Sequence, residues 1–218
     1  MLSLFLLLTP VADAAEPTWS AIKSQSSWSQ VSTRDHAQGG SIGVWNATIG
    51  GITCFKGTAK TSVSPDKLLE VATDIESTPK WSSAGVTQAE TLSRSGDSIE
   101  YFQYLDVPGW TMASDRFWFL AGTTVRSGDT IEFHWNRLNG GGAHSARFQQ
   151  VKAANSSAIE PPVNVGGWRF APADGSVTVE YFICTDTGGA IPAVVQNAAT
   201  KKTLPDTVGE LIGEAAKR

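Results

Sequence analysis

The feature that most limits the fold of this chain is a long run of strand-like segments bounded on both sides by helical ones. Glycine-containing turns such as Gly50-Gly51 and Ser127-Gly128-Asp129 separate segments of alternating or continuous apolar pattern. Strands joined by such short turns pair antiparallel, so the pattern predicts one meandering sheet of about nine strands. The predicted strands are Ser41–Gly50, Ile52–Val63, Val86–Arg94, Ser98–Asp106, Arg116–Val125, Thr130–Arg137, Ala146–Lys152, Gly167–Phe170 and Ser176–Thr185.

Three helical segments accompany this sheet. A short amphipathic helix is predicted within Trp19–Val31, and a second begins at Ser64-Pro65, where Ser64 can cap the helix and Pro65 suits its first turn. The C-terminal helix carries an apolar stripe of Val195, Ala198, Leu204, Val208, Leu211, Ile212 and Ala215, and we expect Pro205 to kink or split it. This order indicates an α+β fold in one domain, residues 15–218. If the last helix stands off from the curled sheet, the space between them can hold an apolar ligand.

Composition limits the classes of partner. The 218 residues include 17 basic and 21 acidic side chains, which give a net charge of −4 and argue against a nucleic-acid partner. The eight Trp and nine Phe favour apolar linings. The two cysteines form no CxxC motif, so we expect neither a structural zinc site nor a cofactor.

The N-terminus has the pattern of an export signal. The apolar run from Leu2 to Val11 is too short to cross a bilayer and precedes Ala12-Asp13-Ala14, a small-x-small site, although no Lys or Arg precedes the run. We therefore expect residues 1–14 to be a signal peptide and the mature protein to be exported, periplasmic or secreted.

Catalytic motifs are not evident. The three histidines, His36, His134 and His144, share no metal-binding spacing, and His134 alternates with two aromatic residues, so we expect it to face solvent. The Gly140-Gly141-Gly142 run lacks the Lys-Ser/Thr of a phosphate-binding loop and is interpreted as a flexible hairpin loop. The chain is therefore not expected to be an enzyme.

Three segments resemble the START-type (steroidogenic acute regulatory protein-related lipid-transfer) helix-grip family. They are Ala72–Trp81, a helix ending in Trp; Asp106–Trp110 with Ser114–Phe117, a loop and an Arg-aromatic strand; and Gly166–Trp168 continued through Gly188–Pro192 to Pro205. The resemblance spans nearly all of residues 15–218, but the family's usual Arg-Asp order is here Asp115-Arg116. It implies a curved sheet wrapped around a long C-terminal helix, a hydrophobic cavity, and a lipid or sterol-like ligand bound without catalysis by a monomer.

Strand alternation on this fold gives the candidate ligand-binding residues. They are Tyr101, Gln103, Trp110, Met112, Arg116, Trp118, Phe133, Trp135, Tyr181 and Val195. The loop from Pro108 to Met112 is either a gate that touches a membrane transiently or a loop folded back on the core. Arg116 either points inward, paired with Glu100 or Asp115 and recognising a head group, or reaches water at the strand end.

The helix-grip arrangement places Cys54 and Cys184 on neighbouring antiparallel strands. They form either a disulfide or two buried thiols, and the second interpretation is slightly favoured because directly opposite positions are not ideal for a bridge. The expected function is to bind a lipid or other hydrophobic molecule and carry it between membranes. The alternative is a cyclase- or hydrolase-like enzyme of the same superfamily, with an acid–base pair drawn from Glu100, Tyr101 or Arg116.

Overall fold

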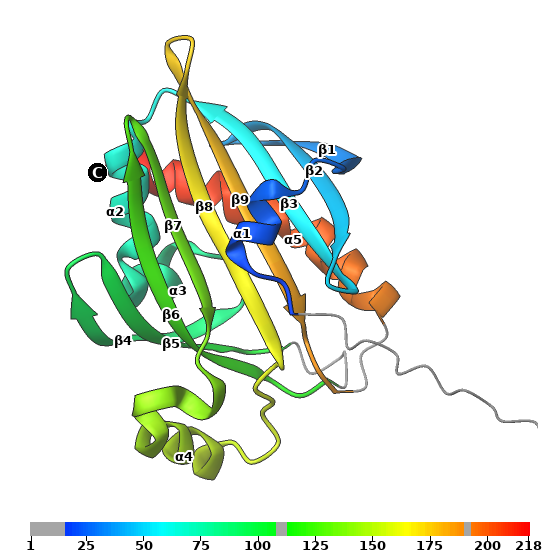
Figure 1. Cartoon of the computed structure of the whole chain (residues 1–218), viewed down its shortest axis with the longest axis vertical. Helices are drawn as coiled ribbons and strands as arrows, with labels where there is room; N and C mark the ends of the chain where they lie inside the picture. The colour runs from blue at the N-terminus through cyan, green and yellow to red at the C-terminus, as the bar shows by residue number, and fades with distance from the viewer. Residues whose placement is uncertain (1–15, 108–112, 190–192) are drawn as a thin grey trace, which may run out of the picture.

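A computed structural model describes residues 16–107, 113–189 and 193–218 of the chain (Figure 1). Its strands are β1 (Ser29–His36), β2 (Gly40–Ile49), β3 (Ile52–Thr61), β4 (Val86–Ser95), β5 (Ser98–Leu105), β6 (Arg116–Ser127), β7 (Thr130–Arg137), β8 (Val163–Ala173) and β9 (Ser176–Asp186). Its helices are α1 (Trp19–Ser24), α2 (Pro65–Thr73), α3 (Thr78–Trp81), α4 (Ser145–Ala154) and α5 (Ala193–Lys217), with 3-10 turns η1 (Ile75–Ser77) and η3 (Asn139–His144).

The nine strands form one antiparallel, curved sheet in the order β1-β2-β3-β9-β8-β7-β6-β5-β4. The strands from β4 to β9 follow one another as a meander, and so do β1 to β3, so these two parts of the sheet join only where β3 pairs with β9. The expected α+β helix-grip architecture is confirmed.

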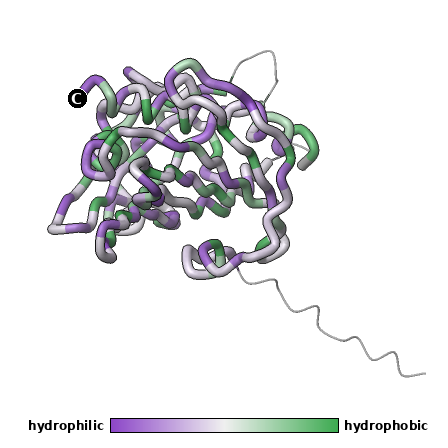
Figure 2. Tube along the Cα trace, turned by 90° about the horizontal axis from the view of Figure 1, so that it is seen from above, coloured by the Kyte–Doolittle hydropathy of each residue, from purple (hydrophilic) through white to green (hydrophobic). Residues whose placement is uncertain are grey.

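The concave side of the sheet is covered by α2 and α5 (Figure 1). Gly57 of β3 allows α5 to approach closely, because a Cβ at this position would lie 2.3 Å from Leu204 Cδ2 and 2.9 Å from Val208 Cγ2. Ser64 caps α2 by accepting a hydrogen bond from the Lys67 amide, as predicted. Seen from above, hydrophobic positions lie along the strands and α5 in the middle of the molecule (Figure 2). The principal core therefore lies between the sheet and these two helices.

The convex side carries two smaller apolar clusters. Ile22 of α1 packs with Phe182 and the two cysteines, whereas Phe148 and Val151 of α4 pack over the buried aromatic residues of β5 and β6. Burial on both faces explains why β6 begins as a continuous apolar run.

Several predicted elements are wrong. Residues 146–152 form α4 rather than a strand, β1 was not predicted, and α5 continues through Pro205 without being split. Residues 140–142 have positive φ angles and form an irregular segment within η3 that leads into α4, rather than a hairpin loop. His134 is half-buried rather than fully exposed to solvent, because Trp19 of α1 stacks on it with ring centroids 5.3 Å apart.

Candidate functional site

The inner face of the sheet, the side that α2 and α5 cover, brings together six of the ten predicted ligand-binding residues. They are Tyr101 and Gln103 of β5, Trp118 of β6, Phe133 and Trp135 of β7, and Tyr181 of β9. Their rings follow one another across the strands, with centroids 6.4 Å apart for Tyr101–Phe133, 6.0 Å for Phe133–Trp135 and 6.1 Å for Trp135–Tyr181. The structure thus places these residues on one surface, and their contact with a ligand stays a prediction.

Glycines allow these aromatic rings to lie against the sheet instead of filling the interior. A Cβ at Gly122 of β6 would come 2.6 Å from the Phe133 ring, and one at Gly166 of β8 would come 2.7 Å from the Trp135 ring. Each ring therefore lies over the backbone of a neighbouring strand. The bulk of the two side chains is thus accommodated along the sheet.

Burial along the inner face falls from one end to the other. Val177 and Val179 of β9 are buried beneath α2 and α5, whereas Tyr181 and Ile183, farther along the same strand, are only half-buried. Burial along α5 varies in the same way. Its buried positions lie between Leu204 and Ala215, and no residue from Val194 to Thr200 is buried. Over these residues, the first turns of α5 therefore bury no side chain against the sheet.

Two tyrosine hydroxyls on the inner face have no partner among the described residues. Burial raises the pKa of Tyr101 well above its usual value, and the nearby phenol of Tyr181 raises it further; burial alone raises the pKa of Tyr181. Within the described residues, the side-chain atoms that are both sealed from solvent and unpaired are Trp118 Nε1 and Glu160 Oε1. The two hydroxyls are also unpaired but are not sealed, so open space lies beside them.

Arg116 has backbone partners in place of the expected carboxylate. Its side chain is 3% exposed, and its guanidinium donates to the carbonyls of Thr187 at 2.8 Å and Gly188 at 3.2 Å, and to the carbonyls of Ser114 and Asp115. Burial lowers its pKa, and the Asp115 charge partly offsets this effect. The arginine therefore ties the start of β6 to the turn that precedes α5, and it does not reach water.

The two carboxylates proposed as its partners have other roles. Asp115 accepts the Tyr104 hydroxyl at 2.7 Å and the Val107 amide at 2.9 Å. Glu100 points to the opposite face from Tyr101 and contacts His144 Nε2 at 2.7 Å. His144 and Ser93 lower the pKa of Glu100 by hydrogen bonding. Of the three groups considered for an enzyme, Tyr101 lies on the inner face, whereas Glu100 points away from it and Arg116 is bound to backbone carbonyls.

The remaining predicted residues lie near one end of the inner face or outside the described structure. Val195 is on the first turn of α5 and is 56% exposed. Trp110 and Met112 fall outside the described residues, so the predicted gate remains a prediction. Asn164, which was not predicted, is a buried polar residue whose Oδ1 accepts the Trp135 indole at 2.9 Å and so fixes that ring. The two residues on each side of Asn164 are apolar or glycine, and this pattern is the sequence feature that could have predicted a buried polar side chain.

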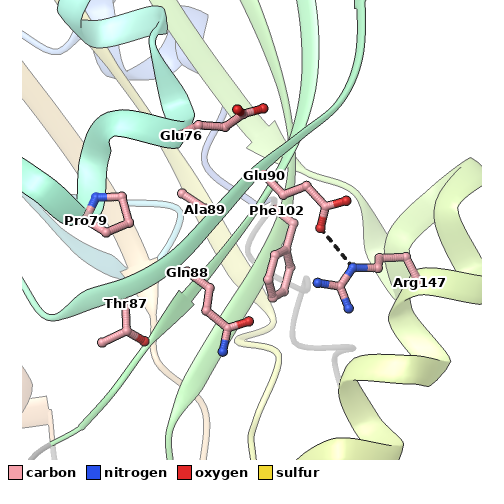
Figure 3. A pocket seen from close by; sticks show the side chains of 8 residues that line it. All are labelled: Glu76, Pro79, Thr87, Gln88, Ala89, Glu90, Phe102 and Arg147. Atoms are coloured by element: carbon pink, nitrogen blue, oxygen red, sulfur yellow. Dashed lines mark hydrogen bonds and ion pairs between the residues drawn. The ribbon is translucent and has the colours of Figure 1, made fainter.

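A separate surface groove of about 500 Å³ lies at the β4 edge (Figure 3). It is lined by Glu76, Pro79, Thr87, Gln88, Ala89, Glu90, Phe102 and Arg147. Arg147 reaches across it to Glu90 at 3.0 Å and lies over the Phe102 ring. Because Arg147 pairs with Glu90 and Glu76 accepts a hydrogen bond from the Thr91 amide, this groove is a weaker candidate than the inner face.

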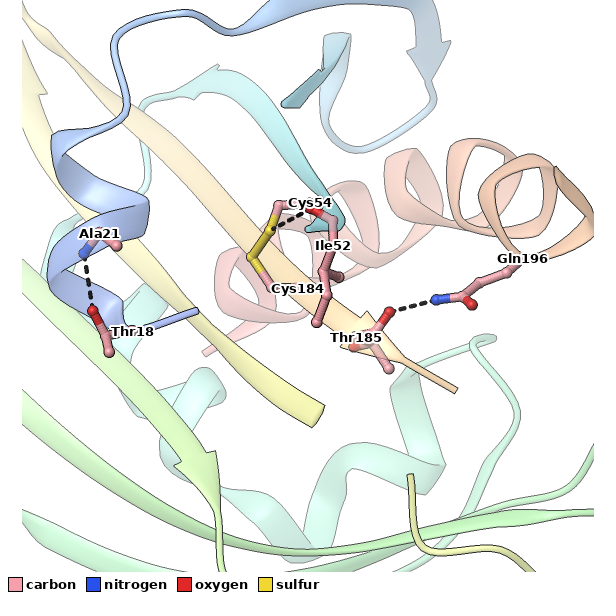
Figure 4. The surroundings of a disulfide bond; sticks show 7 residues. All are labelled: Thr18, Ala21, Ile52, Cys54, Cys184, Thr185 and Gln196. Carbon is pink, nitrogen blue, oxygen red and sulfur yellow. Dashed lines mark hydrogen bonds between the residues drawn. A yellow bond between two sulfur atoms is a disulfide. The ribbon is translucent and has the colours of Figure 1, made fainter. Parts of the chain in front are cut away.

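A disulfide joins Cys54 of β3 to Cys184 of β9 (Figure 4). The predicted register, with the two cysteines opposite each other, is confirmed, and the slight preference for free thiols was wrong. Near the bridge, Gln196 of α5 donates to the Thr185 carbonyl and accepts the Thr187 hydroxyl, so the start of the helix is tied to the end of β9.

Within the described residues, no cluster of His, Cys, Asp or Glu could hold a metal ion, and no helix is long and apolar enough to span a bilayer. The expectation of no cofactor remains a prediction.

Comparison with solved structures identifies the fold. The STAR-related lipid transfer protein from Xanthomonas axonopodis superposes with a TM-score of 0.69 at 19% identity, over 87% of this chain and 98% of that one. Human StAR-related lipid transfer protein 5 gives a TM-score of 0.68 at 14% identity, over 90% of each chain. The chain has the helix-grip fold of the START domains. The Zhui aromatase/cyclase from Streptomyces sp. R1128 shares it more distantly, with a TM-score of 0.55 at 14% identity over 76% of this chain and 94% of that one. No family model and no curated sequence matches the chain.

Proposed function

We propose that this START-fold protein binds a lipid or similarly hydrophobic molecule between the inner face and the first turns of α5, and carries it between membranes. The observation that carries this proposal is the start of α5, where no residue from Val194 to Thr200 is buried although an apolar, aromatic sheet faces the helix. Each CH₂ group moved from water into such a space contributes about 0.8 kcal/mol, so a long tail binds without strong polar contacts.

Binding without catalysis is the favoured form of this proposal. Two of the fold relatives are named as lipid transfer proteins and one as an aromatase/cyclase, so the fold supports both activities. Glu100 faces away from the interior and Arg116 is held by backbone carbonyls, so Tyr101 is the one group considered for the cyclase-like alternative that lies unpaired on the inner face.

The proposed place of action is outside the cytoplasm. The disulfide between Cys54 and Cys184 supports this proposal, because such bonds persist in oxidising compartments and are rare in the cytosol. The signal-like residues 1–14 support it independently. Transient membrane contact would involve the exposed Val194 and Val195 on the first turn of α5, together with Trp110.

Native mass spectrometry of protein purified from the export compartment tests ligand binding, and transfer of a fluorescent lipid between donor and acceptor vesicles tests carriage. Ile183→Trp should fill the space at the half-buried end of the inner face and reduce both signals severalfold. Val125→Trp, an exposed position on the convex side of β6, is the matched control and should leave both unchanged. Absence of any bound apolar molecule, together with no acceleration of transfer, would contradict the proposal.

A further inference from the structure

Two tyrosines, Tyr101 and Tyr181, place polar hydroxyls on the inner face among mostly apolar side chains. Tyr101 is 3% exposed and packs against Phe133 at a centroid distance of 6.4 Å, while Tyr181 packs against Trp168 at 4.4 Å. They come from β5 and β9, which are separated by three strands, and a continuous row of ring contacts through Phe133 and Trp135 joins them. Neither hydroxyl has a hydrogen-bond partner among the described residues.

An unpaired hydroxyl is unusual on a side chain as buried as that of Tyr101, and Tyr181 beside the same row of rings is half-buried. Buried polar groups in folded proteins nearly always have a partner, because an unpaired one forfeits its hydrogen bonds to water. The third tyrosine follows that rule, since Tyr104 on the convex face donates to Asp115 Oδ2 at 2.7 Å. The space beside the two inner hydroxyls therefore points to a partner that is not part of the chain.

The chemistry of these groups limits what that partner is. A phenol with the ordinary pKa of about 10 is already protonated at neutral pH, and burial raises the pKa of both tyrosines further, so each can donate one hydrogen bond and accept others. They carry no positive charge that would balance a carboxylate or a phosphate. Arg116 already donates to four backbone carbonyls, and Arg137, at the end of β7, is paired with Glu160 at 3.3 Å.

We propose that the Tyr101 and Tyr181 hydroxyls form hydrogen bonds to neutral oxygens, hydroxyl or carbonyl, of a ligand that is otherwise hydrocarbon, and so select neutral lipids over anionic ones. This inference rests on the proposed function, since it requires that an apolar ligand enters the same space. Two hydrogen bonds between neutral groups correspond to an affinity effect of roughly five- to thirtyfold.

The test compares probes that share one fluorescent tail. cis-Parinaric acid, its alcohol, its methyl ester and the parent tetraene hydrocarbon are titrated into the protein, with dehydroergosterol as a rigid neutral alcohol, and energy transfer from tryptophan reports binding. The wild-type protein should bind the alcohol and the ester at least fivefold more tightly than the carboxylate. In Tyr101→Phe/Tyr181→Phe, affinity for the alcohol and the ester should fall five- to thirtyfold, and affinity for the hydrocarbon should not change.

The control is Tyr104→Phe, which removes the same atom from the only other tyrosine of the chain and should preserve the order of affinities. Unfolding midpoints of all variants show whether a loss of binding reflects a loss of folding. Tightest binding of the carboxylate, or unchanged affinity for the alcohol in the double variant, would overturn the inference while leaving the proposed function intact. Failure of all five probes to bind would overturn both.

Discussion

Reducing the bond between Cys54 and Cys184 should destabilise the protein by a large and measurable amount. The bridge joins residues 130 positions apart, and the chain-entropy relation gives about 5 kcal/mol for constraining an unfolded chain by a loop of that length. Native bridges deliver about 2–5 kcal/mol, and the upper half of that range is expected here, because the bond spans the β3–β9 pairing that alone joins the two parts of the sheet.

Urea unfolding followed by tryptophan fluorescence measures this difference. Oxidised and dithiothreitol-reduced wild-type protein keep the same atoms in the core, so the comparison isolates the cross-link from any change in packing. The reduced form should unfold at lower urea, with a steeper dependence on urea because its unfolded chain exposes more surface. The free energy of unfolding of Cys54→Ala/Cys184→Ala should lie within about 1 kcal/mol of that of the reduced form, and the remaining difference is the cost of removing two sulfur atoms from the core. The smallest difference in unfolding free energy that such extrapolations resolve is ~0.5 kcal/mol. A difference of less than ~0.5 kcal/mol between the oxidised and reduced proteins would refute this reasoning.

Three further predictions follow from single positions. Arg116→Met should lower the free energy of unfolding by about 3 kcal/mol, because it leaves buried carbonyls unpaired; a loss of ligand affinity with unchanged urea stability would instead favour direct contact with a head group. Gly209→Val should lower the free energy of unfolding by about 1–3 kcal/mol, because a Cβ at this position would lie 2.0 Å from His36 Nδ1. Thermal unfolding measures this loss, and an unchanged melting temperature would show that the β1–β2 turn can move aside. Burial lowers the pKa of His134, so the unfolded state takes up a proton before the folded state does as the pH falls below 6.5. Stability should therefore decrease with falling pH in that range, and His134→Gln should reduce the slope of unfolding free energy against pH; an identical slope would argue against this histidine as the source.

The predicted elements succeed where local rules and tertiary packing agree. Turn glycines delimit the strands of the meander, and Ser64 with Pro65 starts α2, because these residues act through their own backbone and side chain. The edge strand β1 carries mostly polar residues and pairs with a single neighbour, so it has no apolar pattern to detect. In α4, the two apolar residues Phe148 and Val151 lie three apart, and only their contact with the convex face decides that the segment is helical.

Pro205 illustrates how a distant contact overrides a local rule. A proline inside a helix removes one hydrogen bond and disfavours continuation of the preceding turn. Here Arg34 of β1 donates to the Lys202 carbonyl at 3.1 Å and pairs with Asp206, while Leu204 and Pro205 are buried against the sheet. These contacts from the far end of the chain stabilise α5 as one helix.

The candidate site was predictable in its location but not in its bonding. Strand alternation is a property of the sequence, so Tyr101, Phe133, Trp135 and Tyr181 could be assigned to one face. Which polar groups find partners depends on loops and neighbouring strands, and for that reason the backbone carbonyls around Arg116 were not foreseen.

The uneven packing of α5 separates the cost of uncovering the interior from the cost of unfolding the protein. Leu204, Leu211 and Ile212 are almost fully buried, whereas Val194 is 79% exposed, so lifting the first turns forfeits little apolar contact and leaves the C-terminal turns in place. Amide hydrogens near residue 196 should consequently exchange with solvent deuterium far faster than those near residue 211. Such a gradient of local stability along one continuous helix would let a ligand enter and leave at a rate that does not depend on global unfolding.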